Sequence, residues 1–172
     1  MTRPIPAQAA PELSVPTVDG GTWQLAGRTP DSFTMVVFYR GLHCPVCKGF
    51  LGELSTLLPN FEKVGTEVIA VSMDPRERAE QSVREWELGA LTVGYGLTEA
   101  QARGWGLYLS DSIKEAETQV FCEPGLFLVD NSGRLYLINV SKMPFARPDI
   151  ASLPDKIAMA TGNGYPARGT RA

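Results

Sequence analysis

Two cysteines separated by two residues, Cys44 and Cys47, are the side chains of this sequence best suited to chemistry. Thiols at this spacing can close a small disulfide ring, in which one sulfur attacks a substrate and the other resolves the mixed disulfide. The apolar, β-branched run 33–39 precedes them, and hydrophobic residues recur at helical spacing after them. The motif is therefore expected at a helix N-terminus, where free N–H groups and the helix dipole stabilise a thiolate.

Two other interpretations of the thiol pair are weaker. The cysteines could be small buried hydrophobic residues, but a helix N-terminus is a poor place to bury two inert thiols. They could also be half of a zinc site completed by His43 and Cys122. Adjacent His43 and Cys44 cannot easily point at one tetrahedral metal, so we expect no metal and no cofactor.

Three residues near the motif, in sequence or by the expected fold, have more than one interpretation. Arg40 could stabilise a thiolate or a bound peroxide anion, or simply face solvent. His43, the only histidine, could hold a proton or raise the local positive potential, or be a half-exposed loop residue. Cys122 could resolve a sulfenic acid on Cys47, although an ordinary buried cysteine is the favoured interpretation.

Composition limits the classes of function. The 172 residues, 44% of them hydrophobic, fit one domain with a real core. The formal charge of −3 is spread over both signs, which argues against nucleic acid and against a polybasic membrane patch. No segment is apolar over a membrane-spanning length, and no secretory signal pattern begins the chain. With only three cysteines, the chain is expected to be cytoplasmic, with cysteines that serve chemistry rather than structure.

Alternating patterns predict the strands of one mixed sheet. A hairpin with a Gly-rich turn is expected first, and a second hairpin around Asn131-Ser132-Gly133 is expected near the end. The predicted segments are the first hairpin at 15–25, single strands at 33–39, 67–72 and 91–95, and the second hairpin formed by 125–130 and 134–140.

Helices are predicted between and after these strands. The first should run from Cys44 to about Lys63, with Pro59 forcing a kink or an early end. Asp74 is expected to cap the second, with Pro75 at its first position. Two more are expected near 98–104 and over 148–160, the latter interrupted by Pro154.

These elements predict an α/β fold with a mixed central sheet flanked by helices and an N-terminal hairpin. The chain, 1–172, is expected to be a single domain. Its ends, 1–12 and 162–172, are rich in Pro, Gly or Arg and are expected to be flexible tails.

The order of elements, with the thiol motif after the first central strand, resembles the thioredoxin fold and, more narrowly, the peroxiredoxin (alkyl hydroperoxide reductase and thiol-specific antioxidant) family. The resemblance covers roughly residues 11–160. It is carried by the Cys-bearing helix, the strand 67–72, the run 127–130 with its following Gly turn, and the segment 104–107.

The resemblance is imperfect at the site. Peroxiredoxins have Phe-Tyr-Pro, then a Thr, then the peroxidatic Cys three residues later; here Arg40, Cys44 and Cys47 stand at the Pro, Thr and Cys places. The run 38–47 is similar to a group called peroxiredoxin-like. The family's peroxide-polarising Arg is replaced by Pro124, which fits the cis-Pro of thioredoxins instead. Both departures favour general thiol exchange.

The resemblance implies a cysteine-based oxidoreductase that cycles a Cys44–Cys47 dithiol and disulfide, with Arg40 as a further catalytic residue and with Pro124 and His43 binding substrate. In a peroxidase version Cys47 attacks a hydroperoxide and Cys44 condenses with the sulfenic acid. In an exchange version Cys44, more exposed at the helix tip, attacks a protein disulfide and Cys47 resolves.

The implied partners are the hydroperoxide or disulfide substrate and a thiol reductant such as a thioredoxin or glutathione system. No nucleic acid and no membrane is expected, and a homodimer is an assembly that the resemblance allows. The alternative function is a redox-sensing or partner-binding module with negligible turnover.

Overall fold

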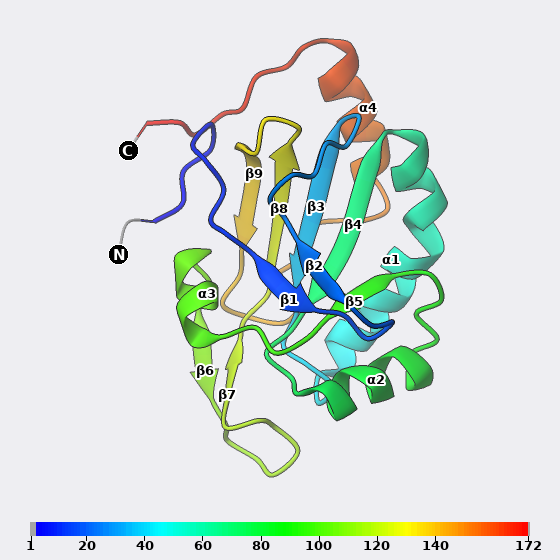
Figure 1. Cartoon of the computed structure of the whole chain (residues 1–172), viewed down its shortest axis with the longest axis vertical. Coiled ribbons are helices and arrows are strands. Elements are labelled where there is room, and N and C mark those ends of the chain that lie inside the picture. The colour runs from blue at the N-terminus through cyan, green and yellow to red at the C-terminus, as the bar shows by residue number, and fades with distance from the viewer. Residues whose placement is uncertain (1–2, 172) are drawn as a thin grey trace.

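The structure is a computed structural model and describes residues 3–171. Figure 1 shows a central twisted sheet with α1, α2 and α4 at one side and the β1–β2 hairpin and α3 at the other. In chain order the elements are β1 (Ser14–Pro16), β2 (Thr22–Gln24), β3 (Phe33–Phe38), α1 (Pro45–Lys63), β4 (Thr66–Val71), α2 (Arg76–Glu85), β5 (Thr92–Gly94), α3 (Glu99–Gly104), β6 (Leu109–Asp111), β7 (Val120–Cys122), β8 (Gly125–Asp130), β9 (Leu135–Val140) and α4 (Leu153–Gly162).

The central strand of the sheet is β3, in the order β5-β4-β3-β8-β9. It runs parallel to β4 and antiparallel to β8, so the sheet is mixed. All six β3 residues are buried, because helices cover one face and the hairpin and α3 cover the other. The predicted mixed α/β fold with an N-terminal hairpin is confirmed.

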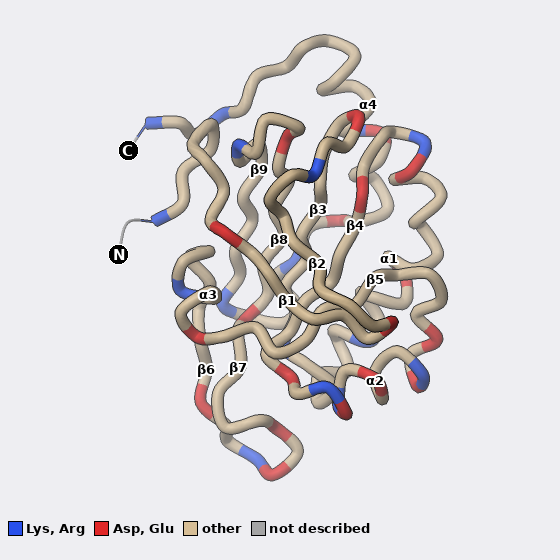
Figure 2. The backbone as a smooth tube through the Cα atoms, viewed as in Figure 1, with Lys and Arg blue, Asp and Glu red and all other residues tan. Residues whose placement is uncertain are grey.

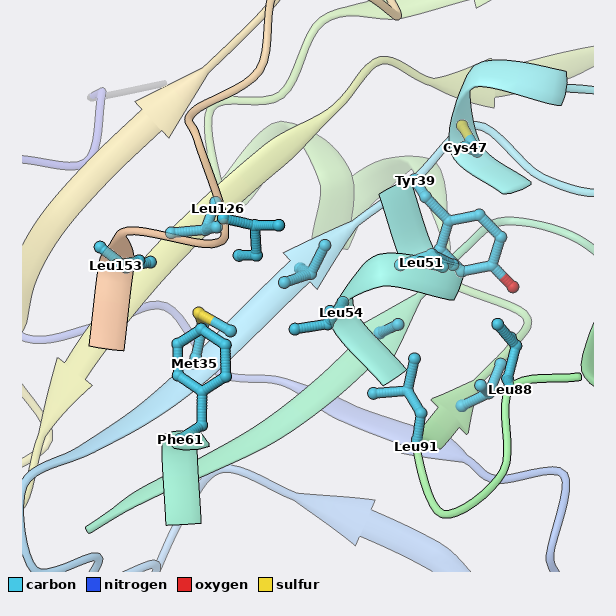
Figure 3. Close-up of a cluster of buried hydrophobic side chains, with 14 of the residues drawn as sticks. Met35, Tyr39, Cys47, Leu51, Leu54, Phe61, Leu88, Leu91, Leu126 and Leu153 are labelled. Atoms are coloured by element: carbon cyan, nitrogen blue, oxygen red, sulfur yellow. The ribbon is translucent and has the colours of Figure 1, made fainter. Parts of the chain in front are cut away.

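The core has two layers, one on each face of the sheet. Figure 3 shows Leu51, Leu54 and Phe61 of α1 directed at the sheet, with Met35 of β3 beside Phe61. On the other face the Trp105 ring packs against those of Phe38 and Phe127, with centroids 5.4 Å and 4.9 Å apart. The two layers fix the direction in which β3 leaves the sheet and enters the thiol motif.

The helix that bears the thiols matches its prediction. It spans Pro45–Lys63 with Cys44 as N-cap, and Gly65 follows its end at a φ of +67°. Pro59 lies inside the helix and does not end it. None of the helices in residues 3–171 has the length and apolar character to span a bilayer.

The predicted start of α2 is wrong. Pro75 is the N-cap and makes no side-chain capping bond. The Asp74 side chain does not bond to the first N–H groups of α2. Its carboxylate accepts hydrogen bonds from the Leu42 N–H at 2.7 Å and from the Arg78 Nε–H at 3.1 Å. This carboxylate is fully buried, and these two charge-compensating donors satisfy it better than a helix cap near solvent would.

The predicted start of the last helix is also wrong. It begins at Leu153 rather than residue 148, with Pro154 in the first turn instead of interrupting the helix. Proline is suited to a first turn because its missing N–H would have no partner there. Residues 141–152 therefore form a loop between β9 and α4. The short strands β6 and β7 were not predicted; they pair antiparallel and bring Cys122 to Leu109.

Asp74 fixes the loop that leads to the thiols, and Gly41 makes this possible. Gly41 has a φ of +126°, and a Cβ there would lie 2.7 Å from both carboxylate oxygens of Asp74. Any side chain at this position would push the carboxylate away from the Leu42 N–H, so only glycine fits.

We expect Gly41→Ala to lower the free energy of unfolding by about 3 kcal/mol, because it combines a clash with backbone strain. Gly20→Ala is the matched control: Gly20 has a φ of +96° with nothing within 4 Å of the added Cβ, and strain alone should cost about 1 kcal/mol. Urea unfolding measures both. Equal losses for the two variants would show that the contact with Asp74 does not matter.

Candidate active site

The structure brings the two predicted thiols together at the N-terminus of α1. Cys44 has extended backbone angles, and its Sγ accepts the N–H of Cys47 at 3.2 Å, so the sulfur acts as the helix cap. Cys44 is 1% exposed and Cys47 0%. Cys44 is therefore not exposed at the helix tip as we expected, and both motif cysteines are buried.

Arg147 is a site residue that the sequence analysis missed. Its Nη2 donates to the Cys47 Sγ at 2.8 Å, and its guanidinium lies over the Phe50 ring, 4.9 Å from the centroid. Its Nε donates to the Pro144 carbonyl at 2.6 Å, which fixes the side chain within the 141–152 loop. A guanidinium placed in this way stabilises negative charge on the sulfur.

The two thiols share protons as a pair. The hydrogen bond from the Cys47 thiol lowers the pKa of Cys44 to about 6 despite burial, and the Cys47 N–H and Arg147 act in the same direction. Burial, and then the hydrogen bond with Cys44, raises the pKa of Cys47 well above its usual value. The pair therefore loses one proton near pH 6 and resists losing the second, because two negative sulfurs would repel each other.

Arg40 is held by carboxylates rather than by the thiols. Its Nε lies 3.4 Å from a Glu123 carboxylate oxygen, and its Nη2 lies 3.9 Å from Glu117. The guanidinium also stacks 4.7 Å from the centroid of the Phe121 ring. These partners compensate its charge, so it contributes less positive potential at the sulfurs than Arg147 does; its catalytic role stays a prediction.

His43 lies beside the same aromatic ring. Its imidazole centroid is 4.6 Å from that of Phe121, and neither ring nitrogen has a hydrogen-bond partner among the described residues. Burial, and then the charge of Arg40, lowers the pKa of His43 to about 4. The imidazole is therefore neutral near pH 7 and adds no positive potential there.

Cys122 and Pro124 reach the site from β7 and the turn that follows it. Cys122 is fully buried, its Sγ donates to the Tyr39 carbonyl at 3.4 Å, and burial raises its pKa to about 12. Pro124 is buried and lines a cavity of about 10 Å³ together with Phe50 and Arg147. The cis-Pro expectation is wrong, because every peptide bond described is trans.

A metal site is not formed by these residues. Within residues 3–171 no three His, Cys, Asp or Glu side chains come close enough together to hold a metal ion. The polar groups that contact the motif sulfurs are the Cys47 N–H, which donates to Cys44 Sγ, and the Arg147 guanidinium, which donates to Cys47 Sγ.

Comparison with protein families decides what kind of thiol protein this is. The AhpC/TSA family matches residues 6–138, a span that includes both thiols and most of the sheet. The chain belongs to the AhpC/TSA family. It is a thiol-dependent oxidoreductase of the peroxidase type, an enzyme class that uses a hydroperoxide as oxidant and a thiol as reductant.

Solved structures share the fold. The peroxidoxin BcpB of Mycobacterium tuberculosis is 14% identical over 95% of this chain and 99% of its own, with a TM-score of 0.73. A peroxiredoxin-like protein from Aquifex aeolicus is 17% identical over 92% and 89%, with a TM-score of 0.74. The reduced 2-Cys peroxiredoxin of Plasmodium vivax is 16% identical over 94% and 84%, also with a TM-score of 0.74. A search of the curated proteins gave no match.

We expect the thiolate absorbance of this AhpC/TSA protein to show one step near pH 6, from the pair of Cys44 and Cys47. Because the thiolate is the nucleophile, alkylation by iodoacetamide should become faster as the pH rises through this value. Cys44→Ser should remove the step, and Cys122→Ser should not. A titration curve with no thiolate formed below pH 8 would contradict the shared-proton arrangement.

Proposed function

We propose that this AhpC/TSA protein reduces small hydroperoxides through a Cys44–Cys47 dithiol and disulfide cycle in which Arg147 stabilises the attacking sulfur. The observation that carries this proposal is the 2.8 Å contact between Arg147 Nη2 and Cys47 Sγ. Cys47 also stands at the place of the peroxidatic cysteine in the family pattern. Arg147 would then supply the charge that the family's arginine supplies, from a different part of the chain.

The first step places the negative charge on Cys47. In the resting pair the charge lies on Cys44, whose pKa is the lower of the two. The Cys47 proton therefore passes to Cys44 along their hydrogen bond before the attack, and Arg147 stabilises the Cys47 thiolate that this leaves. The Cys47 thiolate attacks one peroxide oxygen, the O–O bond breaks, and the sulfenic acid forms. The leaving alkoxide or hydroxide takes a proton and departs as alcohol or water, and Arg147 stabilises the charge that develops on it.

The second step uses Cys44. Its sulfur attacks the Cys47 sulfenic acid, the S–O bond breaks, and water leaves as the disulfide forms. The Cys47 N–H and Arg147 also lower the pKa of Cys44. Both groups remain when the Cys47 thiol has become a sulfenic acid, so they favour the Cys44 thiolate in this attack. An external thiol, such as that of a thioredoxin or glutathione system, then reduces the disulfide by two successive exchanges.

Burial supports a small substrate. Both motif residues are at most 1% exposed, and attack on a protein disulfide requires a bulky sulfur to approach the thiolate in line. A hydroperoxide needs far less room. Reduction by an external thiol then requires the first turn of α1 or the 141–152 loop to move. We propose separately that the protein is cytoplasmic, because its three cysteines are all free.

The second candidate is a redox-sensing or partner-binding module. Val46, between the two cysteines, and Met143 and Phe145, in the loop that carries Arg147, are exposed at 41%, 47% and 75%. Exposed apolar side chains on segments that border the thiols are suited to contact with another protein. Steady-state consumption of hydrogen peroxide with dithiothreitol separates the candidates, since a sensor would show negligible turnover.

We expect hydrogen peroxide to convert the reduced protein to a Cys44–Cys47 disulfide, because Cys44 caps the turn that holds Cys47. Mass spectrometry after proteolysis identifies the linked peptide. In Cys44→Ser the reaction should stop at a Cys47 sulfenic acid that dimedone traps. A dominant Cys47–Cys122 linkage would show that the resolving cysteine is misassigned.

We expect Arg147→Met to lower kcat/KM for hydrogen peroxide by about 10- to 100-fold, because a hydrogen bond to a charged group contributes about 1.5–3 kcal/mol. Arg40→Met is the comparison, with a smaller loss expected because two glutamates already compensate its charge. Initial rates at several peroxide concentrations measure both. If Arg40→Met loses more than Arg147→Met, the peroxide-stabilising arginine is Arg40.

A further inference from the structure

A second cleft, separate from the thiols, lies along the β9 edge of the sheet. It encloses about 810 Å³, within the range of small-molecule sites. Its floor is β9 and one side of α4, and its outer wall is made by the two ends of the chain, which Figure 1 shows lying side by side at this edge. Neither Cys44, Cys47 nor Arg147 lines it.

The walls of the cleft are mainly apolar. Tyr136, Leu137 and Ile138 contribute from β9, and Ile157 and Ala160 contribute from α4. The opposite wall comes from residues 4–6 and 165–169. An extended apolar channel of this kind stabilises an alkyl chain, at about 0.8 kcal/mol for each CH₂ removed from water.

The two terminal segments are fixed in place by the body of the protein. The Ala7 N–H donates to the Leu135 carbonyl at 2.7 Å, and Ala9 forms an antiparallel bridge with Arg134. On the other side, the Tyr136 hydroxyl donates to the Tyr165 carbonyl at 2.8 Å. The cleft is therefore a built feature, and the N-terminal segment already occupies the start of the β9 edge that a second copy would need for strand pairing.

The charges around the cleft have one sign. Arg3, Lys156, Arg168 and Arg171 line it, with no Asp or Glu. Within residues 3–171 none of the four forms an ion pair; Lys156 Nζ donates to Ser152 Oγ, and Arg168 to the Tyr165 hydroxyl. Figure 2 shows Lys and Arg positions, drawn in blue, on both terminal segments. The mouth of the cleft is therefore positively charged, although the net charge of the whole chain is −3.

We propose that this cleft binds the carboxylate form of a free fatty acid. The alkyl chain lies along β9 and α4, and the carboxylate meets the cations of the terminal segments and Lys156, because guanidinium and ammonium groups bind carboxylates through charge-assisted hydrogen bonds. Uncharged apolar molecules would leave the cations unused, and a compact polar anion would leave the apolar walls unused.

Isothermal titration of the full-length protein with laurate, below its micelle concentration, tests the proposal. We expect one laurate per chain, with octanoate and dodecyltrimethylammonium each at least tenfold weaker. The first has a shorter chain, and the second has the same chain with the opposite charge. Equal affinity for laurate and dodecyltrimethylammonium, or no laurate binding, would overturn the proposal.

Two variants separate the chain from the charge. Ala160→Trp should fill the channel and weaken laurate at least tenfold, and Lys156→Gln combined with Arg168→Gln should do the same. Lys63→Gln, which removes an exposed cation at the end of α1, is the control and should leave binding unchanged. Unchanged hydrogen peroxide turnover in all three would show that they fold. Unchanged laurate affinity in the first two would contradict the proposal.

Two other occupants give distinct results. If a second copy covers the cleft, sedimentation should show a dimer that laurate does not bind. If a membrane surface covers it, phosphatidylglycerol vesicles should capture the protein while free laurate has no effect. Either result overturns the fatty-acid assignment, and neither bears on the thiol chemistry, which is measured by peroxide turnover.

Discussion

A negative charge on a buried sulfur is costly, and the contact between Arg147 and Cys47 compensates it. Two neighbouring thiols beneath the surface share one charge near neutral pH, and three groups stabilise it: the other thiol, the N–H of Cys47 at the start of α1, and the guanidinium of Arg147. The helix N-terminus supplies its N–H through backbone geometry alone. The arginine must be held there by tertiary structure.

The rest of the site limits which cation acts on the sulfurs. Glu117 and Glu123 compensate Arg40, and Asp74 compensates Arg78. The same Asp74 holds the Leu42 N–H and thereby the loop between β3 and Cys44. The carboxylates thus fix the chain around the motif and reduce the effect of nearby arginines, while Arg147 contacts the sulfur directly. Thiol position and thiol charge are controlled by different residues.

Local pattern was sufficient for most of the fold and for the motif. The apolar run of β3, the helical spacing of α1 and the short helix expected near 98–104 are each determined within a few residues, and the structure contains all three. Arg147 could not be found in this way, because it lies 100 residues from Cys47, between the strand predicted at 134–140 and the helix predicted at 148–160. Its only sequence signal is Pro148, the next residue, because a proline disfavours helical conformation at the residue before it.

The errors have different origins. Pro124 was expected to be cis by resemblance to thioredoxins, and it is trans. Asp74 was expected to cap α2 on a local signal, and it bonds instead to the Leu42 N–H and Arg78. Burial changes which partner a polar group takes, and sequence spacing does not report burial. The strands β6 and β7, three residues each, are too short to give a periodic signal.

The most direct measurement is the thiolate titration of Cys47 in a Cys44→Ser background, with and without Arg147→Met. Removing Cys44 leaves Cys47 as the one motif thiol. Burial raises the pKa of Cys47 as well as that of Cys122, so Cys122→Ser is added to both proteins and leaves Cys47 as the one cysteine. The account predicts that Arg147→Met raises the pKa of Cys47 by about 1 or more, since a charged hydrogen bond contributes about 1.5–3 kcal/mol. Identical pKa values for Cys47 in the two proteins would show that Arg147 does not stabilise the thiolate.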